Sequence, residues 1–167
     1  MERLPDEAQL LAESDVSTYR ASGPGGQNRN KVESAVRIRH RPTGIAAIAE
    51  ESRSQAENRR GALRRLRKAL ALQVRRPVSE DTVPQEVRAC IDGKGRLGVG
   101  RRDGRYLGAA ASVLDVLVAA EGSVSATAAR LGLTTGNLSA FLTADEDLMA
   151  EANRIRADRG LKALRRN

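Results

Sequence analysis

The residues best suited to chemistry lie in one short segment, Ser22-Gly23-Pro24-Gly25-Gly26-Gln27. Its glycines and proline interrupt helices and strands, so the segment is expected to be a loop. Gly25 and Gly26 can adopt positive φ angles, and their successive N–H groups can surround an oxyanion or a phosphate. Gln27 adds a neutral amide that can orient a water molecule. By these properties alone, an oxyanion-stabilising loop and a phosphate-binding loop are equally supported, although no Gly-Lys-Ser/Thr continuation of a P-loop follows.

Conventional catalytic residues are scarce, since the chain has one histidine, His40, and one cysteine, Cys90. A Ser-His-Asp or Cys-His set would have to use His40, which falls where a hairpin strand would end and is interpreted as structural or solvent-facing. The carboxylates nearest the loop, Asp15 and Glu33, do not form a pair. The single cysteine also excludes an internal disulfide framework. We therefore expect no metal, no cofactor and no conventional acid–base machinery.

Positive charge is concentrated in the first half of the chain. The formal charge is +8, with 16 basic and 9 acidic residues in 1–76 but 13 and 12 in 77–167. This surplus favours a polyanionic partner, usually nucleic acid, although a basic protein that is merely soluble would have the same composition. Because Tyr19, Tyr106 and Phe141 are the only aromatic residues, contacts to phosphates are favoured over base stacking. The absence of an apolar signal segment or of about 20 successive apolar residues predicts a cytoplasmic protein without membrane contact.

The pattern predicts an α+β protein whose residues 1–76 form a small mixed α/β domain. We expect a helical turn around Glu7–Leu11, a strand over 16–21 and a hairpin over 36–50, in which apolar and basic residues alternate. The capping-box pattern from Ser54 to Glu57 opens a helix that extends to Val74.

The two sides of this helix differ in character. An apolar stripe should pack on the hairpin, and it consists of Leu63, Leu66, Leu70 and Val74. Much of the remaining surface is basic, with Arg59, Arg60, Arg64, Arg67 and Lys68. A solvated face is one interpretation, but a phosphate-binding face is favoured because little acid is interleaved after Glu57.

The second half is expected to comprise a linker with a short hairpin, residues 77–107, and an all-helical unit, residues 108–167. The expected helices are an amphipathic one through Val113–Val118, one over 126–131 capped by Ser125 and ended by Gly132, one over 135–141, and one over 145–159. The middle pair is spaced as in a helix-turn-helix, with a plain three-helix bundle as the alternative. Six basic residues gather at the end, and we expect them to dock on RNA and to be removable without unfolding the rest: Arg154, Arg156, Arg159, Lys162, Arg165 and Arg166.

The longer string from Arg20 to Lys31, Arg-Ala-Ser-Gly-Pro-Gly-Gly-Gln-Asn-Arg-Asn-Lys, closely resembles the catalytic domain of class I peptide chain release factors. It also resembles their codon-independent relatives, the ribosome-rescue hydrolases that carry the same Gly-Gly-Gln sequence. Ser34–Arg37, Arg41–Ile45 and Ser52–Gln55 continue the likeness, which covers roughly residues 14–72. The chain departs from the family at Asn28-Arg29-Asn30, where His-Val-Asn is common.

The resemblance implies that Gly25, Gly26 and Gln27 are the catalytic residues of a peptidyl-tRNA hydrolase. In the family this loop enters the peptidyl transferase centre and promotes attack of water on the ester joining the nascent peptide to the tRNA. The N–H of Gln27 would stabilise the developing negative charge, and its side chain, often methylated in the family, would select water. Residues expected at the base of the loop or against rRNA and tRNA are Arg20, Ser22, Gly23, Arg29, Asn30, Lys31, Arg37, Arg39, Arg53, Arg60, Arg64 and Arg67.

Release without stop-codon reading is the expected function, because fewer than 20 residues precede the first predicted strand and no codon-reading domain is apparent. The expected partners of this ribosome-rescue factor are the large ribosomal subunit, rRNA and peptidyl-tRNA, and the protein is expected to be a monomer. The alternative is a nucleic-acid-binding regulator that uses the C-terminal helix-turn-helix and carries a non-catalytic glycine loop.

Overall fold

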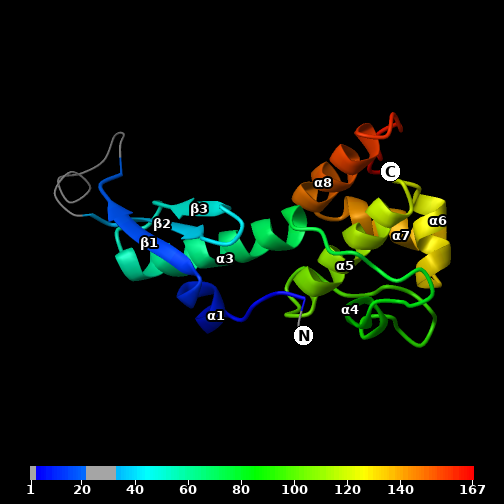
Figure 1. Cartoon of the computed structure of the whole chain (residues 1–167), viewed down its shortest axis with the longest axis horizontal. Coiled ribbons are helices and arrows are strands. Elements are labelled where there is room, and N and C mark those ends of the chain that lie inside the picture. Colours follow the sequence, from blue (N-terminus) through cyan, green and yellow to red (C-terminus); the bar gives the residue numbers. More distant parts are fainter. Residues whose placement is uncertain (1–2, 22–32) are drawn as a thin grey trace. The chain divides into compact units, whose positions relative to one another are not determined.

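The structure of the chain, a computed structural model, describes residues 3–21 and 33–167 (Figure 1). It confirms an α+β protein, in which helices accompany a small antiparallel sheet. The chain divides into two compact units, residues 2–70 and residues 71–167, called here the N-terminal and the C-terminal unit. The division falls inside helix α3 (Gln55–Gln73) and not at the expected residue 76. No described helix is long and apolar enough to cross a bilayer.

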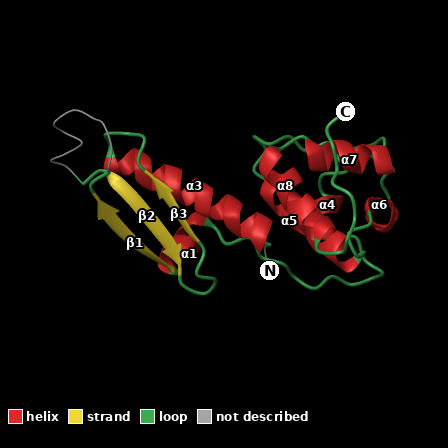
Figure 2. Cartoon of the chain, turned by 90° about the horizontal axis from the view of Figure 1, so that it is seen from above, coloured by secondary structure: helices red, strands yellow, loops and turns green. Residues whose placement is uncertain are grey.

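The N-terminal unit contains a three-stranded antiparallel sheet in the order β1-β2-β3. Helix α1 (Glu7–Ala12), capped by Asp6, leads into β1 (Ser14–Tyr19), and β2 (Ala35–His40) and β3 (Ala46–Ala49) follow (Figure 2). The expected turn, strand and hairpin are therefore confirmed, but β1 begins and ends two residues earlier than predicted. In the observed register Ser14 pairs with His40 and Tyr19 with Ala35.

Helix α3 packs against one face of this sheet. Val36 and Ile38 are buried while Arg37 and Arg39 are exposed, as the alternation predicts. The predicted stripe Leu63, Leu66 and Leu70 is buried, but Val74 lies beyond the end of α3 and is only half-buried. Helix α3 approaches β3 closely at Gly61, which has no side chain. A Cβ added to Gly61 would lie 3.3 Å from the Cβ of Ala49.

The start of α3 departs from the expected capping box. Ser54 Oγ does accept from the N–H of Glu57, at 3.3 Å. The Glu57 carboxylate, however, accepts from Ser52 Oγ, and the Ser54 N–H also donates to Ser52 Oγ. In a capping box the Glu57 carboxylate would accept from the Ser54 N–H, and here Ser52 Oγ accepts from it instead.

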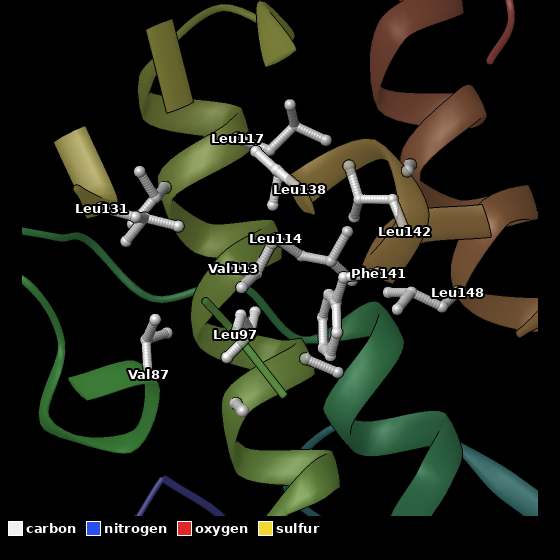
Figure 3. Packing of buried hydrophobic residues seen from close by; sticks show 14 of the residues in the cluster. Val87, Leu97, Val113, Leu114, Leu117, Leu131, Leu138, Phe141, Leu142 and Leu148 are labelled. Atoms are coloured by element: carbon white, nitrogen blue, oxygen red, sulfur yellow. The ribbon is translucent and has the colours of Figure 1, made fainter. Parts of the chain in front are cut away.

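The C-terminal unit is built around α5 (Tyr106–Ala119), with α4 (Gln85–Arg88), α6 (Val124–Leu131), α7 (Thr135–Thr143) and α8 (Glu146–Ala157). Every residue from 109 to 117 is buried, because α4, α6 and α8 all contact this helix. The expected amphipathic helix is therefore buried all round. Val113, Leu114 and Leu117 meet Leu138, Phe141 and Leu142 of α7 in the core (Figure 3).

Residues 77–107, expected to be a linker, contribute to this same core. Val87, Cys90 and Leu97 are buried within it. An antiparallel bridge between Ile91 and Leu97 forms the short hairpin that the sequence suggested. Nearby, Arg75 pairs with the buried Asp115 at 3.1 Å. The segment is thus held by the C-terminal unit and does not act as a free tether.

The last three helices all begin with a polar side-chain cap, and the one cap that was predicted differs in position. Ser123, not Ser125, accepts from the N–H of Ala126 and begins α6, since the helix starts earlier than predicted. Thr134 and Asp145 cap α7 and α8. Gly132 ends α6 with φ of 68°, in agreement with the prediction.

The basic C-terminal end is largely part of the fold, which corrects the expectation that it is a separable docking element. Ile155 is buried in the core, and Leu164 packs against that core. Arg156 donates to the carbonyl of Gly122 at 2.6 Å, and Arg166 donates to that of Thr143 at 3.0 Å. Asn153 exchanges hydrogen bonds with the backbone of Leu164.

Removing residues 154–167 should therefore unfold or strongly loosen the C-terminal unit. Ile155→Ala alone should reduce the free energy of unfolding by about 2–5 kcal/mol, the cost of a buried large-to-small change. Arg165→Ala, at an exposed position, is the control and should change it by less than about 0.5 kcal/mol. Urea unfolding followed by circular dichroism measures both, and a fully stable 1–153 fragment would contradict this account of the C-terminal end.

Candidate functional site

The segment that carries the predicted chemistry connects two paired strands. Tyr19 at the end of β1 lies opposite Ala35 at the start of β2, so the two strands that residues 20–34 connect meet at the same end of the sheet. Arg20 is exposed and Ala21 is buried at the departing end. The predicted residues Ser22, Gly23, Gly25, Gly26, Gln27, Arg29, Asn30 and Lys31 lie outside the described residues.

The returning end of this segment is held by two side chains from the first turns of α3. Asn58, buried in the unit, donates through its amide to the carbonyls of Ser34 and Ser52, both at 2.8 Å. Its amide oxygen accepts from the N–H of Ser52 at 3.0 Å. Gln55 donates to the carbonyl of Glu33, also at 2.8 Å. The helix, the turn before it and the start of β2 are therefore joined through side-chain amides.

A second contact closes the same end of the sheet. The Tyr19 hydroxyl donates to Glu50 Oε2 at 3.2 Å. Tyr19 of β1 pairs with Ala35 of β2, and the register of β2 with β3, continued by one residue, places Ala35 opposite Glu50. The tyrosine side chain therefore crosses over the buried Ala35 to reach Glu50. Burial, and then the bond to Glu50, raise the pKa of Tyr19, so the phenol stays protonated and able to donate at neutral pH.

The far end of the sheet is fixed by His40, whose structural interpretation the contacts confirm. Its two ring nitrogens lie 2.8 Å from Thr43 Oγ1 and 3.0 Å from Glu13 Oε2. Hydrogen bonds from Gln9 and then His40 lower the pKa of Glu13. Both ring nitrogens are thus occupied within the fold, and the ring is nearly buried.

The predicted RNA-contacting arginines divide between two opposed surfaces. Arg37 and Arg39 are exposed on the face of the sheet that α3 does not cover. Arg60 and Arg64 are exposed on α3, one turn apart and on the side away from Ala62 and Leu66, which face the sheet. Arg53 is exposed in the turn before α3.

These five arginines form no salt bridge with any residue in the described part of the chain. Arg65, in contrast, donates to the carbonyl of Ile48 and to the Glu51 carboxylate. The hydrogen bond from Arg65 lowers the pKa of Glu51. Arg67 is only half-exposed, and its buried Nε has no hydrogen-bond partner among the described residues. Among the predicted RNA-contacting arginines of α3, Arg60 and Arg64 are therefore exposed, whereas Arg67 is partly buried.

Asn58 and Gln55 are the positioning residues that the sequence prediction did not assign. Asn58→Ala should lower the free energy of unfolding by about 1–3 kcal/mol, because it leaves the buried carbonyl of Ser34 and the half-buried backbone of Ser52 without this partner. Gln55→Ala removes one exposed hydrogen bond and should lower it by about 0.5–1.5 kcal/mol. Urea titrations compare the two variants, and an Asn58→Ala protein as stable as the wild type would contradict the role assigned to the amide.

The sequence matches the RF-1 domain family over residues 10–98. Among curated proteins, it is 40% identical over 105 residues to peptide chain release factor 1 of Methylibium petroleiphilum, covering 60% of this chain and 27% of the relative. It is 34% identical over 143 residues to peptide chain release factor 2 of Neisseria meningitidis, covering 85% of this chain and 34% of the relative.

Peptide chain release factor 1 of Ureaplasma parvum is 56% identical over 55 residues, 33% of this chain and 15% of that protein. Among solved structures, RF2 of Thermus thermophilus shares 38% identity with a TM-score of 0.28, covering 41% of this chain and 23% of that one. The chain thus spans about a third or less of the length of these relatives. The family match extends over more than half of this chain and includes the glycine loop with the residues that hold its ends, and the chain therefore belongs to the RF-1 domain family of peptide chain release factors.

Proposed function

We propose that this chain hydrolyses the ester bond of peptidyl-tRNA in the peptidyl transferase centre of the large ribosomal subunit. The observation that carries the proposal is the Gly25-Gly26-Gln27 sequence within the matched release-factor domain. Both described ends of the segment containing it are fixed to the sheet and α3. A rigid base suits a loop whose backbone has to meet a reacting carbonyl in one geometry.

In the proposed mechanism the chemistry comes from backbone and amide groups. The N–H of Gln27 donates to the negatively charged oxygen that develops as water attacks the ester carbon. The Gln27 side chain orients that water, and Gly25 and Gly26 allow the main chain to approach the tRNA end where a Cβ would obstruct it. Preorganised donors of this kind act only as charge develops, and so they raise the rate of the chemical step.

The charge distribution of the N-terminal unit supports RNA as the surrounding partner. Arg37 and Arg39 on one surface and Arg60 and Arg64 on the opposed one suit a partner that encloses the unit, not one that meets a single flat side. No aromatic side chain in the described chain is fully exposed, since Tyr106 and Phe141 are buried and Tyr19 is half-buried with its hydroxyl bound to Glu50. Contacts to phosphates, without base stacking, are therefore expected.

We further propose that release by this chain does not require a stop codon and serves ribosomes or large subunits that still hold peptidyl-tRNA. The matched residues 10–98 include the Gly25-Gly26-Gln27 segment, and the C-terminal unit is a helical bundle closed around its own core. Peptide release from ribosomes with an empty decoding site, compared with ribosomes paused at a stop codon and at a sense codon, tests this point. Release restricted to the stop-codon complex would contradict it.

The competing function, a regulator that binds nucleic acid through α6 and α7, has less support. Helix α7 carries no charged residue, and the one basic residue of α6, Arg130, lies 3.8 Å from Glu80. Asn137 on α7, a side-chain type that can contact bases, instead binds the backbone N–H of Leu97 at 2.9 Å. This helix pair therefore lacks the cations that supply affinity for phosphates.

Gln27→Ala and Gly26→Ala should each reduce the rate of peptide release by at least ~100-fold, the scale for losing an oxyanion donor. Ribosome binding should remain nearly unchanged, because neither substitution alters the basic surfaces. Gln73→Ala, an exposed glutamine at the end of α3, is the matched control. Single-turnover release of labelled peptide from purified stalled ribosomes is the measurement, and undiminished release by the Gln27 variant would remove the enzymatic proposal.

Replacing Arg37 and Arg39, or Arg60 and Arg64, with glutamate should weaken ribosome binding in both cases, because an enclosing RNA contacts both surfaces. For every phosphate that a substituted arginine no longer neutralises, the slope of log affinity against log salt should fall by about 0.7–0.9. Release at saturating concentration should be preserved. An effect confined to one pair would contradict the enclosed arrangement and indicate a single RNA-facing side.

A further inference from the structure

A second concentration of positive charge lies in the C-terminal unit, in residues 88–105, called here the glycine-basic segment. It holds 6 basic and 2 acidic residues, whereas the rest of 77–167 holds 7 basic and 10 acidic. The near neutrality of the second half is therefore the sum of a strongly basic segment and an acidic remainder. Five glycines are interspersed with the basic residues of this segment: Gly93, Gly95, Gly98, Gly100 and Gly104.

The first part of the glycine-basic segment is ordered by its own hydrogen bonds. Asp92 Oδ1 accepts from the N–H groups of Lys94 and Arg96, at 2.8 and 3.0 Å, and the Asp92 N–H donates to the carbonyl of Arg96. Leu97 at its base is buried in the core. Asn137 of α7 binds both the N–H and the carbonyl of Leu97. The tight turn that presents Lys94 is thus rigid.

The second part is ordered by Asp103. This carboxylate accepts from the backbone N–H of Arg105 at 2.9 Å and from its guanidinium at 2.7 Å. These bonds lower the pKa of Asp103 to about 2, so the carboxylate is ionised at neutral pH and its charge is engaged by Arg105. Both acidic residues of the segment are therefore occupied, Asp92 with the turn and with Arg96 at 3.4 Å, and Asp103 with Arg105.

Three cations of the segment remain outside these interactions, since Arg88 donates to the carbonyl of Val83. Lys94, Arg101 and Arg102 are exposed, and none forms a salt bridge with a residue that the structure describes. Arg101 and Arg102 are adjacent in the sequence, and like charges this close repel one another, a repulsion that a polyanion relieves. This local charge is a feature that the fold itself does not use.

The glycines of the segment provide an independent observation. At Gly93, Gly100 and Gly104 an added Cβ would meet no heavy atom within 4 Å, and none of the three has a left-handed φ. Neither internal packing nor backbone conformation therefore requires glycine at these positions. A bare main chain beside exposed cations does allow a phosphate to approach the backbone closely.

We propose that the glycine-basic segment is a second RNA-binding surface, which contacts the phosphodiester backbone through Lys94, Arg101 and Arg102 and the glycine main chain beside them. The choice of RNA among polyanions rests on the proposed function, whereas the binding surface itself does not depend on peptide release. No aromatic side chain is exposed in the described residues around the segment, since Tyr106 is buried, so the surface binds phosphates and not bases. This assigns RNA binding in the C-terminal unit to residues 88–105, and not to α6 and α7 or to the basic C-terminal end.

The test compares two double variants of the full chain that change net charge equally: Arg101→Glu with Arg102→Glu, and Lys162→Glu with Arg165→Glu. Lys162 and Arg165 are exposed near the C-terminal end. Affinity for a labelled RNA hairpin is measured across a salt series. Because two phosphates are no longer neutralised, the slope of log affinity against log salt should fall by about 1.4–1.8 for the first variant, and the second variant should keep the wild-type slope. Gly100→Ala with Gly104→Ala should weaken binding while leaving the unfolding midpoint unchanged.

Equal decreases in affinity for the two charge variants would mean that net charge alone determines binding, and would overturn the proposal. Unchanged RNA affinity in the Arg101 and Arg102 variant would overturn it as well. Peptide release by the wild-type chain is measured separately, so that the two proposals are tested independently. If the wild-type chain releases no peptide while the Arg101 and Arg102 variant still binds RNA more weakly, the proposed function fails and this surface stands.

Discussion

The side-chain amide of Asn58 is the interaction on which the arrangement around the glycine loop depends. Three of its hydrogen bonds join α3, the turn at Ser52 and the start of β2 at Ser34. The bond to Ser34 is buried, so water cannot replace it, and its loss would leave a backbone carbonyl unsatisfied. The β1–β2 register fixes the departing strand at Tyr19. Together these constraints determine where the described ends of residues 20–34 lie, and hence the base on which the predicted catalytic geometry has to be built.

Elements with a strong local period could be predicted from the sequence. Val36–Arg39 alternates as a strand with one buried face, and Leu63, Leu66 and Leu70 follow the helical period. Where a residue is buried by neighbours distant in sequence, the local pattern was not enough to predict its burial. The apolar residues of 77–107 have no period, and Val87 and Leu97 are buried only because helices later in the chain surround them. Helix α5 has a visible stripe, but neighbours on several sides bury the rest.

The candidate site shows the same division between local motif and distant contact. Gly25, Gly26 and Gln27 could be singled out because glycine, proline and a family motif are local features, and their catalytic role stays a prediction. Arg37 and Arg39 could be placed on an exposed face by alternation. The roles of Asn58 and Gln55 could not be predicted, because each bonds to a backbone carbonyl more than 20 residues away in sequence. The one local hint was asparagine in a helix, where it is a poor helix former and where a tertiary contact often explains its presence.

Arginine has two physical uses in this chain, and counting charges does not separate them. Arg156 and Arg166 donate to carbonyls of the C-terminal unit, and Arg159 donates to Glu121. Such a guanidinium keeps its charge, but donors committed to the fold are withdrawn from contact with a ligand. Arg101 and Arg102 lie between Gly100 and Gly104 in the sequence, and the two carboxylates of their segment are already engaged. The basic C-terminal end therefore closes the helical bundle, whereas the segment whose composition resembled a linker keeps its donors for a phosphate backbone.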